Sequence, residues 1–425
     1  MRLVARSPER AWPIVESQMN VTYLNPTAGL GGAERCLLDM LLGCQRAGSG
    51  VRASVVLLEA GPLVAAVRAL GVRCEVIELP HAIASVGESS TGSIGRLAAS
   101  VATAPATAPE VARFLRVLRS CIADTSPSVI HSNGLKTHLL ARWVCPTQVP
   151  VICHLHDFIG SRLISSHAIV PAATEQTYYI ANSRAVAVDA ARVLGSGDRV
   201  RCIHNGVDTT LFSPQKIDAS WLDLAADAPA ATSETVRVGL VGTYARWKGQ
   251  DVFIDAVGLL PETVRARARF YIIGGPIYAT AGSQWSQAEL QKRALGAGVR
   301  ADVLFVPFQQ DPAHVMRSLD CLVHASTQPE PFGRTIIEGM ACGKPVIVAA
   351  AGGAAELFSD GVDALGVPGG HPRMLANAMM SLIESSTLRR RIGTAGRETA
   401  IRVFRIELFQ RKIIETYCAL QGQQN

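Results

Sequence analysis

The chain has 425 residues, of which 48% are hydrophobic and 18% are charged. This length and composition exclude a disordered chain and indicate a globular protein of two or three domains. The net charge of +6 is small for this length. It carries no nucleic-acid signature and allows only weak attraction to phosphates or to an anionic membrane surface.

The sequence offers no sign of a membrane span or of a disulfide framework. No apolar run reaches the roughly 18 residues that a spanning helix needs. Residues 1–18 lack the apolar core of a signal peptide, and we expect them to form a disordered extension. The ten cysteines are scattered without a C-x-x-C pair, which favours a reducing compartment. We therefore expect a cytoplasmic protein, with peripheral contact at the inner membrane face left open.

Short apolar runs rich in β-forming residues alternate with helical patterns, as in a parallel α/β fold. In the first half the predicted strands are 21–25, 53–58, 74–78, 129–131, 151–155 and 178–181. In the second half they are 236–241, 269–273, 302–306, 321–324 and 346–350. In both halves polar residues follow strand ends, the edge at which open α/β sheets bind ligands. The pattern predicts one cleft between two facing domains.

Two segments interrupt this rhythm. Residues 83–109 are rich in Ala, Ser, Thr, Gly and Pro and are predicted to form a flexible loop or insertion. Residues 215–235 are predicted to be a linker between Rossmann-like domains at 19–214 and 236–404. From residue 372 onward the chain is helical and basic. We expect its arginines to form a solvated face, with binding to membrane phosphates as the alternative.

The first candidate site in chain order is the loop 25–34, which carries Gly31 and Gly32. These glycines allow close approach of the backbone to a ligand, and the helix expected to open at Ala33 offers free N–H groups. A dinucleotide-binding fingerprint is the rival interpretation, but its third glycine would fall at Glu34. A turn without a ligand is the other alternative.

His154 and His156 follow at the end of the strand 151–155. One of the two is expected to face the cleft, while the other packs away from it. A histidine in this position is often structural, so position alone leaves both interpretations open.

The second half begins with the strand 236–241, a turn at Gly242, and then Arg246 and Lys248 before a helix. A glycine turn with two cations is typical of a site that neutralises phosphate. A pair of basic surface residues is the alternative.

The most informative stretch is 329–348, which places Glu330 and Glu338 eight residues apart around the start of a helix. Pro331 suits a helix entry, and the Gly-Lys-Pro sequence at 343–345 ends the helix. N–H groups at its first turn favour an anion. An anion site between two carboxylates suits a nucleotide-sugar, whereas two solvated glutamates on a surface helix are the bland alternative.

The whole arrangement in 329–348 resembles the donor-site motif of the retaining family 4 glycosyltransferases, which adopt the GT-B fold. The resemblance spans about residues 21–417 and is strongest over 236–358. It implies two facing Rossmann-like domains with a cleft between them. It also implies that about 405–425 cross back onto the N-terminal domain.

The resemblance also implies roles for individual residues. Glu330, with the backbone N–H groups of Phe332 and Gly333, should bind the donor sugar near the reacting carbon, and Glu338 should bind the ribose. His156 falls at the family's H-D position near the reacting sugar. Thr243 stands where the family usually carries an arginine, and Arg246 is the expected replacement. The other implied contacts to donor and acceptor are Lys248, Gly242, Arg334, Thr335, Gly31 and Gly32.

The implied activity is transfer of a sugar from a UDP-, GDP- or ADP-sugar to a hydroxyl, with retention at the anomeric carbon. The acceptor would be a glycan, a lipid-linked molecule or a small molecule, in glycan, envelope polysaccharide or glycolipid synthesis. No Asp-x-Asp pair occurs, so we expect neither a metal nor a cofactor besides the nucleotide-sugar. The alternatives are a nucleotide-sugar epimerase or phosphorylase on the same fold, or a catalytically idle binder of sugar nucleotides.

Overall fold

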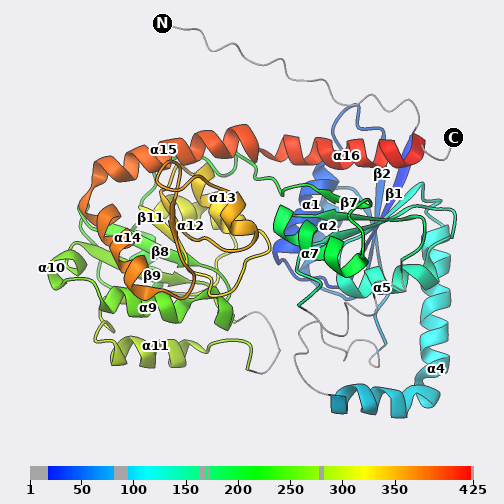
Figure 1. The fold of residues 1–425 in the computed structure, drawn as a ribbon, viewed down its shortest axis with the longest axis horizontal. Helices are drawn as coiled ribbons and strands as arrows, with labels where there is room; N and C mark the ends of the chain where they lie inside the picture. Colours follow the sequence, from blue (N-terminus) through cyan, green and yellow to red (C-terminus); the bar gives the residue numbers. More distant parts are fainter. Residues whose placement is uncertain (1–17, 81–93, 162–168, 170–172, 277–281, 423–425) are drawn as a thin grey trace, which may run out of the picture. The chain divides into compact units, whose positions relative to one another are not determined.

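The computed structural model describes residues 18–80, 94–161, 169, 173–276 and 282–422 (Figure 1). It divides into two compact units, and each is described here by itself. The first comprises residues 1–182, 186–206 and 407–425, and the second comprises 183–185 and 207–406. The expected extension at 1–18 lies almost wholly outside the described residues.

The first unit contains a seven-stranded sheet with the order β3-β2-β1-β4-β5-β6-β7, and all its strand pairs are parallel. The sequence order reverses between β1 and β4, which is the switch point of a doubly wound sheet. The strands are β1 Met19–Asn25, β2 Val51–Leu57, β3 Arg73–Val76, β4 Val129–Ser132, β5 Val151–Leu155, β6 Thr177–Ala181 and β7 Val200–Cys202.

Helices cover both faces of this sheet, because successive residues of its strands point to opposite sides. Tyr23 of β1 belongs to a core cluster with α1, α2 and α16, whereas Leu24 belongs to a second cluster with α4, α5 and α7. The helices are α1 Gly32–Cys44, α2 Pro62–Ala69, α4 Ile94–Ala123, α5 Leu135–Val144, α7 Arg184–Leu194 and α16 Ile406–Gly422.

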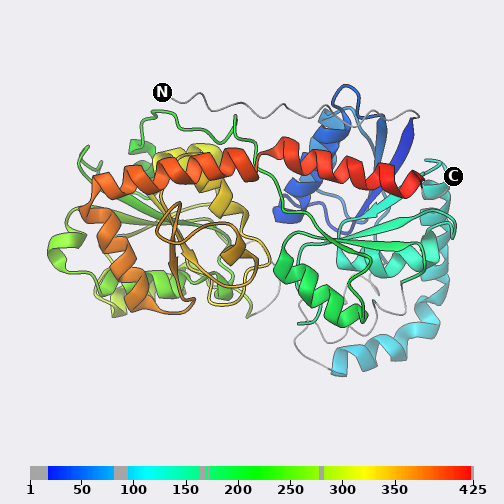
Figure 2. The same cartoon turned by 45° about the horizontal axis from the view of Figure 1, so that its top comes forward.

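The last helix, α16, packs on the first unit although it follows the whole of the second unit in sequence (Figure 2). Its apolar residues Phe409, Ile413 and Tyr417 lie in the same core cluster as β1 and α1. The return of the chain end to the N-terminal unit is therefore as expected.

The second unit contains a six-stranded sheet with the order β10-β9-β8-β11-β12-β13, again parallel throughout. Ile272 of β9 faces the core formed with α9, α11 and α14, and Tyr271 faces the core formed with α8, α12, α13 and α15. Its strands are β8 Val236–Val241, β9 Ala268–Ile273, β10 Val303–Val306, β11 Cys321–His324, β12 Val346–Ala349 and β13 Leu365–Val367. Its helices are α8 Ser220–Ala225, α9 Gln250–Gly258, α10 Glu262–Arg265, α11 Gln287–Gly296, α12 Pro312–Ser318, α13 Arg334–Ala341, α14 Pro372–Glu384 and α15 Ser386–Val403, with 3-10 turns η1 Arg246–Lys248 and η2 Gly353–Glu356.

The flexible loop predicted for 83–109 is wrong over its second part, because residues 94–109 belong to the helix α4. Alanine is the best helix former, and the alanine-rich composition favours a helix more than its serines and threonines favour a loop. The rest of the prediction, over 83–93, lies outside the described residues.

The linker predicted at 215–235 also differs from the structure, because these residues belong to the second unit. Asp223 of α8 is 1% exposed and accepts hydrogen bonds from Tyr271 at 2.5 Å and from Arg269 at 2.6 Å. Burial alone would raise the pKa of Asp223, but these hydrogen bonds and the Arg269 charge lower it. The segment is thus held to β9 by a buried charge, and the chain enters the second unit at Val207.

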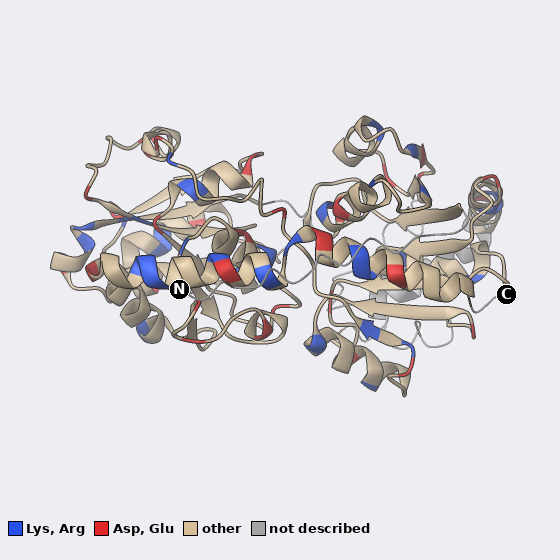
Figure 3. Cartoon of the chain, turned by 90° about the horizontal axis from the view of Figure 1, so that it is seen from above, with Lys and Arg blue, Asp and Glu red and all other residues tan. Residues whose placement is uncertain are grey.

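None of the described helices combines the length and apolar character that crossing a membrane requires. Along α16 acidic and basic residues are interspersed (Figure 3), as is typical of a helix with a solvated face. These are Glu407, Arg411, Lys412 and Glu415.

Candidate functional site

The centre of the candidate site in the second unit is the carboxylate of Glu330, on the loop between β11 and α13. The loop is fixed by backbone hydrogen bonds on both sides of this residue. The N–H of Glu330 donates to the carbonyl of Ala351 at 3.2 Å, and the N–H of Gly353 donates to the carbonyl of Glu330 at 2.7 Å. Only 6% of Glu330 is exposed. A buried carboxylate requires partners, and the structure supplies three.

Lys248, at the end of η1, donates from Nζ to both oxygens of Glu330, at 2.9 and 3.0 Å. The hydroxyl of Ser326 donates to Oε2 of Glu330 at 2.8 Å, and Nε2 of His324 lies 3.1 Å from the same oxygen. The structure therefore brings together two of the predicted site residues, which are 82 positions apart in sequence. Burial alone would raise the pKa of Glu330, but the charge of Lys248 and the hydrogen bond from His324 hold it well below its usual value. Glu330 is ionised at neutral pH.

Glu338 lies on α13 and is also 6% exposed. Its Oε1 is 3.5 Å from Nε of Arg334, one turn earlier on the same helix face. Glu338 and Arg334, two of the predicted donor contacts, thus lie close together, and Thr335 follows Arg334 in the same turn. All three residues stand on one short helix that begins directly after Glu330 and its loop.

The entry to α13 is shaped by Gly333, the N-cap, which has a φ of +98°. In this left-handed region a side chain is strained, and a Cβ here would meet Cδ1 of Ile336 at 2.6 Å. The ring of Phe332 is buried, with its centroid 6.5 Å from that of Phe404. Phe332 can therefore meet a ligand chiefly through its backbone, which is the role predicted for it.

Arg246 lies apart from the Lys248–Glu330 pair. Its Nη2 binds Glu289 at 2.8 Å, its Nε donates to the carbonyl of Gly282 at 3.0 Å, and its guanidinium stacks 3.9 Å from the ring centroid of Trp285. A role for Arg246 in binding the donor stays a prediction, and it would require release of the contact with Glu289.

Gly242 follows β8, as predicted, and another glycine packs closely against it. A Cβ at Gly274 would lie 1.9 Å from the carbonyl oxygen of Gly242, so the two turns touch through their backbones. Among the described residues, a Cβ added at Gly242 would meet no atom within 4 Å.

The first unit holds a separate pocket at the carboxyl end of its sheet. His156 lies just after β5 and lines this pocket, and the predicted loop contributes Ala33 and Glu34. Gly31 caps α1 and Gly32 is its first residue, so both directly precede the lining residues. The full lining is Pro26, Thr27, Ala33, Glu34, Asn133, Gly134, Leu135, His138, His154, Leu155, His156, Asp157, Phe158 and Ile159.

On the side of its stacking partner His154, His156 adjoins a buried series of histidine and tyrosine rings. The ring of His154 stacks on that of His156 with centroids 4.3 Å apart, and Nδ1 of His154 lies 3.2 Å from Nε2 of His131. The hydroxyl of Tyr417 is 2.8 Å from Nδ1 of His131 and 2.9 Å from the hydroxyl of Tyr23. Burial lowers the pKa of His131 to about 3 and that of His154 well below its usual value, so both rings are neutral at ordinary pH. Of the two histidines at this strand end, His156 reaches the pocket edge while His154 is fully buried.

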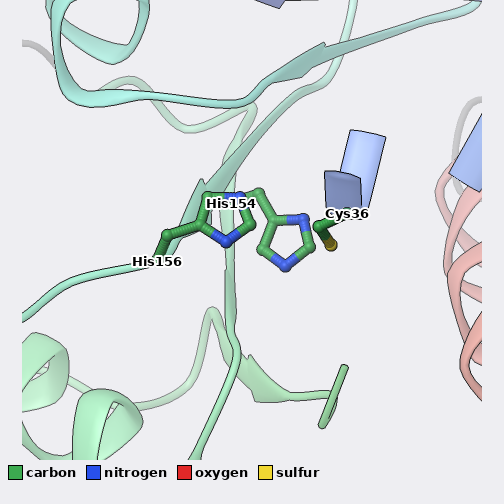
Figure 4. Close-up of side chains that lie close together, drawn as sticks. All are labelled: Cys36, His154 and His156. Atoms are coloured by element: carbon green, nitrogen blue, oxygen red, sulfur yellow. The ribbon is translucent and has the colours of Figure 1, made fainter. Parts of the chain in front are cut away.

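Among the described residues, one group could hold a metal ion, namely Cys36, His154 and His156, whose ligand atoms lie within 4.8 Å of one another (Figure 4). The two imidazole planes are only 28° apart. Lone pairs of nearly parallel stacked rings do not converge on one ion, so tetrahedral coordination would require one ring to turn. The absence of a metal stays an expectation from sequence.

Three residues of these sites were not predicted. His324 and Ser326 bind Glu330, and Asn133 binds His156 with its Oδ1 2.8 Å from Nε2. His324 ends a predicted strand, the position at which the other candidates were found, so it could have been chosen. Asn133 and Ser326 also follow predicted strands by two residues, but nothing in the sequence shows that they bind His156 and Glu330.

Two doubly wound parallel units, with the final helix returned to the first, define a protein of the GT-B class. Residues 30–211 match the family model for glycosyltransferase family 4, and residues 227–399 match the model for glycosyl transferases group 1. The chain belongs to the family 4 glycosyltransferases.

Individual relatives agree with this assignment. A D-inositol 3-phosphate glycosyltransferase of Xylanimonas cellulosilytica is 30% identical over 57% of this chain and 56% of its own length. The lipopolysaccharide core biosynthesis glycosyltransferase LpsE of Rhizobium meliloti is 29% identical over 44% of this chain and 49% of its own. The chain thus matches about half the length of these curated relatives. The crystal structure of Anabaena HepE in complex with UDP and glucose superimposes with a TM-score of 0.76 at 26% identity, covering 94% of this chain and 99% of HepE.

Proposed function

We propose that this protein is a retaining glycosyltransferase that moves a sugar from a nucleotide-diphosphate sugar to an acceptor hydroxyl, in the synthesis of a glycan, an envelope polysaccharide or a glycolipid. The observation that carries the proposal is the buried, ionised Glu330, held by Lys248 at 2.9 Å directly before the N-terminus of α13. Family membership supports the reaction class. HepE, solved with UDP and with UDP-glucose, supports a nucleotide-sugar donor and makes UDP the first base to test.

In the proposed reaction the second unit binds the donor. Glu338 accepts hydrogen bonds from the ribose hydroxyls, and Glu330 accepts them from the sugar. Negative charge develops on the diphosphate as the bond to the sugar breaks. Lys248 and the positive end of the α13 helix dipole are suited to stabilise that charge, because both are fixed before the reaction begins. Arg246 joins them if its contact with Glu289 is released.

The first unit is proposed to bind the acceptor at the pocket that His156 lines, near the Gly31–Gly32 turn. A hydroxyl of the acceptor or of the donor sugar would be held by the imidazole, and an oxygen of the leaving phosphate would take the acceptor proton. No metal is assigned a role in this scheme.

The first experiment is a thermal-shift screen of the purified protein against UDP, GDP, ADP, UDP-glucose, UDP-N-acetylglucosamine and GDP-mannose, without added metal. A ligand that binds only the folded state raises the melting temperature by mass action. We expect a rise with one nucleotide base and none with the other two. No rise with any of them would contradict the proposed donor site.

The selected donor then enters an acceptor assay followed by NMR of the product. A new glycosidic bond with the donor's anomeric configuration is the expected outcome. An isomerised nucleotide-sugar would identify an epimerase, and phosphate-dependent release of a sugar phosphate would identify a phosphorylase. Binding without any product would indicate an idle binder.

A further inference from the structure

We propose that Asn133 is a positioning residue that holds His156 in its Nε2–H tautomer, so that Nδ1 is the ring nitrogen able to accept a hydrogen bond from a substrate hydroxyl. The assignment of a hydroxyl rests on the proposed function, whereas the tautomer follows from hydrogen bonds alone.

Two backbone carbonyls, which can only accept hydrogen bonds, orient the side-chain amides beside His156. The carbonyl of Ala33 lies 3.1 Å from the side-chain amide of Asn133, so the NH₂ group of Asn133 must face it. The carbonyl of Thr27 lies 2.6 Å from the side-chain amide of Asn25, which orients that amide in the same way. Oδ1 of Asn25 then faces Asn133 and accepts its second N–H at 2.7 Å.

With both N–H groups of Asn133 used, its Oδ1 is the atom left for His156. Oδ1 lies 2.8 Å from Nε2 of His156, and a carbonyl oxygen cannot donate. Nε2 therefore carries the proton, and in the neutral ring Nδ1 carries none. The orientation is rigid, because Asn25 is fully buried and Asn133 is 1% exposed. The backbone N–H of Asn133 also donates to the carbonyl of Leu24 at 2.8 Å.

The same chain of hydrogen bonds reaches the loop with the Gly31–Gly32 turn. Thr27 belongs to this loop and Ala33 to the first turn of α1 that follows it. Asn133 thus joins the loop to the imidazole of His156, while stacking on His154 sets the plane of that imidazole. The buried side-chain amide of Asn133 thus fixes both the position of the His156 ring and the nitrogen that carries its proton. Asn133 directly follows β4, and no other role is predicted for this strand end.

The test reads the tautomer directly. Long-range ¹H–¹⁵N NMR of the full-length protein with ¹⁵N-labelled histidine distinguishes the protonated ring nitrogen, and His156→Gln identifies the signals. We expect His156 in the wild type to show a protonated Nε2 and an unprotonated Nδ1 near pH 8. A wild type in the Nδ1–H form would overturn the proposal without the need for any variant.

Two variants and a matched control extend the test. Asn133→Ala should give a mixture of tautomers and lower kcat about 10-fold with a changed pH profile, because the wrong nitrogen is then protonated. Asn133→Asp keeps the acceptor oxygen that faces Nε2, so it should keep the Nε2–H form, at a lower melting temperature because its second oxygen faces the oxygens of Asn25 and Ala33. Asn182 is the control, since its Nδ2 donates to the backbone carbonyl of His156 at 3.2 Å and leaves the ring alone. Asn182→Ala should keep the wild-type tautomer.

The two proposals fail in different ways. If Asn133→Ala melts at a lower temperature but keeps a pure Nε2–H ring, Asn133 is merely structural and this inference is wrong. If His156→Ala transfers sugar at the wild-type rate while the tautomer is as expected, the role proposed for His156 in the reaction is wrong and the tautomer assignment stands.

Discussion

At the scale of single residues, Lys248 and Glu330 act as one charged unit in the free protein. The donor diphosphate proposed for Lys248 must therefore share this cation with Glu330. An ammonium group has three N–H donors, and two of them are directed at the two carboxylate oxygens. Binding a diphosphate would draw Lys248 partly away, which makes Glu330 a stronger acceptor for sugar hydroxyls.

Replacing Lys248 by methionine leaves the buried Glu330 without its cation. We expect a loss of about 3 kcal/mol in the free energy of unfolding, the size typical of breaking one side of a buried ion pair. Urea unfolding measures this change. The control is the double variant Lys248→Met with Glu330→Gln, which should recover much of the loss because no unpaired charge remains. Additive losses from the two single changes would show that the pair is not coupled.

The same pair predicts a dependence of stability on pH. The pKa of Glu330 is lowered in the folded state, whereas an unfolded glutamate titrates at about 4.3. The folded form is thus favoured above pH 4.3, and this contribution is lost as the pH falls toward the folded pKa. The stability difference between wild type and Glu330→Gln should therefore be constant from pH 6 to 8 and shrink below about pH 4. A difference that grows on acidification would contradict the assigned direction of the shift.

Substitution of Glu338 should mainly weaken nucleotide binding, whereas substitution of Glu330 should mainly lower turnover. Glu338→Ala should weaken UDP binding about 10-fold, the equivalent of one lost hydrogen bond to a charged group. Glu330→Gln should lower kcat more than it weakens binding. Calorimetric titration and steady-state kinetics of both variants check this. An unchanged UDP titration of Glu338→Ala would exclude its ribose role.

The sequence predicts the charged residues of the site but not their pairing. Separate local patterns indicate Glu330 and Lys248, and nothing in either pattern shows that the two side chains meet. Asn133 was missed for a related reason, because its function lies entirely in hydrogen bonds to Asn25, Ala33 and His156.

At the scale of elements, the start of α13 depends on the backbone of Gly333. Gly333→Ala places a Cβ in a left-handed conformation and 2.6 Å from Ile336. We expect a loss of about 1–2 kcal/mol in stability together with weaker nucleotide binding, because the N–H groups of the first turn move. Gly296 is the last residue of α11 and has open space where a Cβ would stand, so Gly296→Ala is the control, and it should leave nucleotide binding unchanged without lowering the stability. Thermal melts with and without UDP measure both effects.

Strands were predicted well where they are buried on both faces, since apolar runs such as 346–350 then stand out between turn signals. The sequence missed β7 and β13, which have three residues each and are partly exposed. The prediction of a loop was also wrong for 94–109, because the apolar residues of this part of α4 show only a weak helical periodicity. The length and burial of a strand, more than its β propensity, thus determine whether it can be predicted from the sequence.

At the scale of the whole molecule, the first unit is discontinuous in sequence and the second is nearly continuous. Phe409, Ile413 and Tyr417 of α16 complete the core beside β1, so residues 19–206 lack part of their own core. The boundary could not be placed from composition, because the polar segment 215–235 contains the buried Asp223 and Leu222. The polar composition of 215–235 is typical of a linker, but the buried ion pair between Asp223 and Arg269 holds this segment to the second unit.

This asymmetry predicts how the molecule divides. Residues 207–406 expressed alone should unfold cooperatively and bind UDP, because both core clusters of the second unit lie within them. Residues 19–206 alone should not unfold cooperatively, since removal of α16 uncovers the apolar face of β1 and α1. Supplying residues 407–425 through a flexible linker should restore a cooperative transition. Urea titration followed by circular dichroism and tryptophan fluorescence tests all three fragments. If 19–206 unfolds cooperatively without α16, that helix is an accessory to the core of the first unit and is not required for its folding.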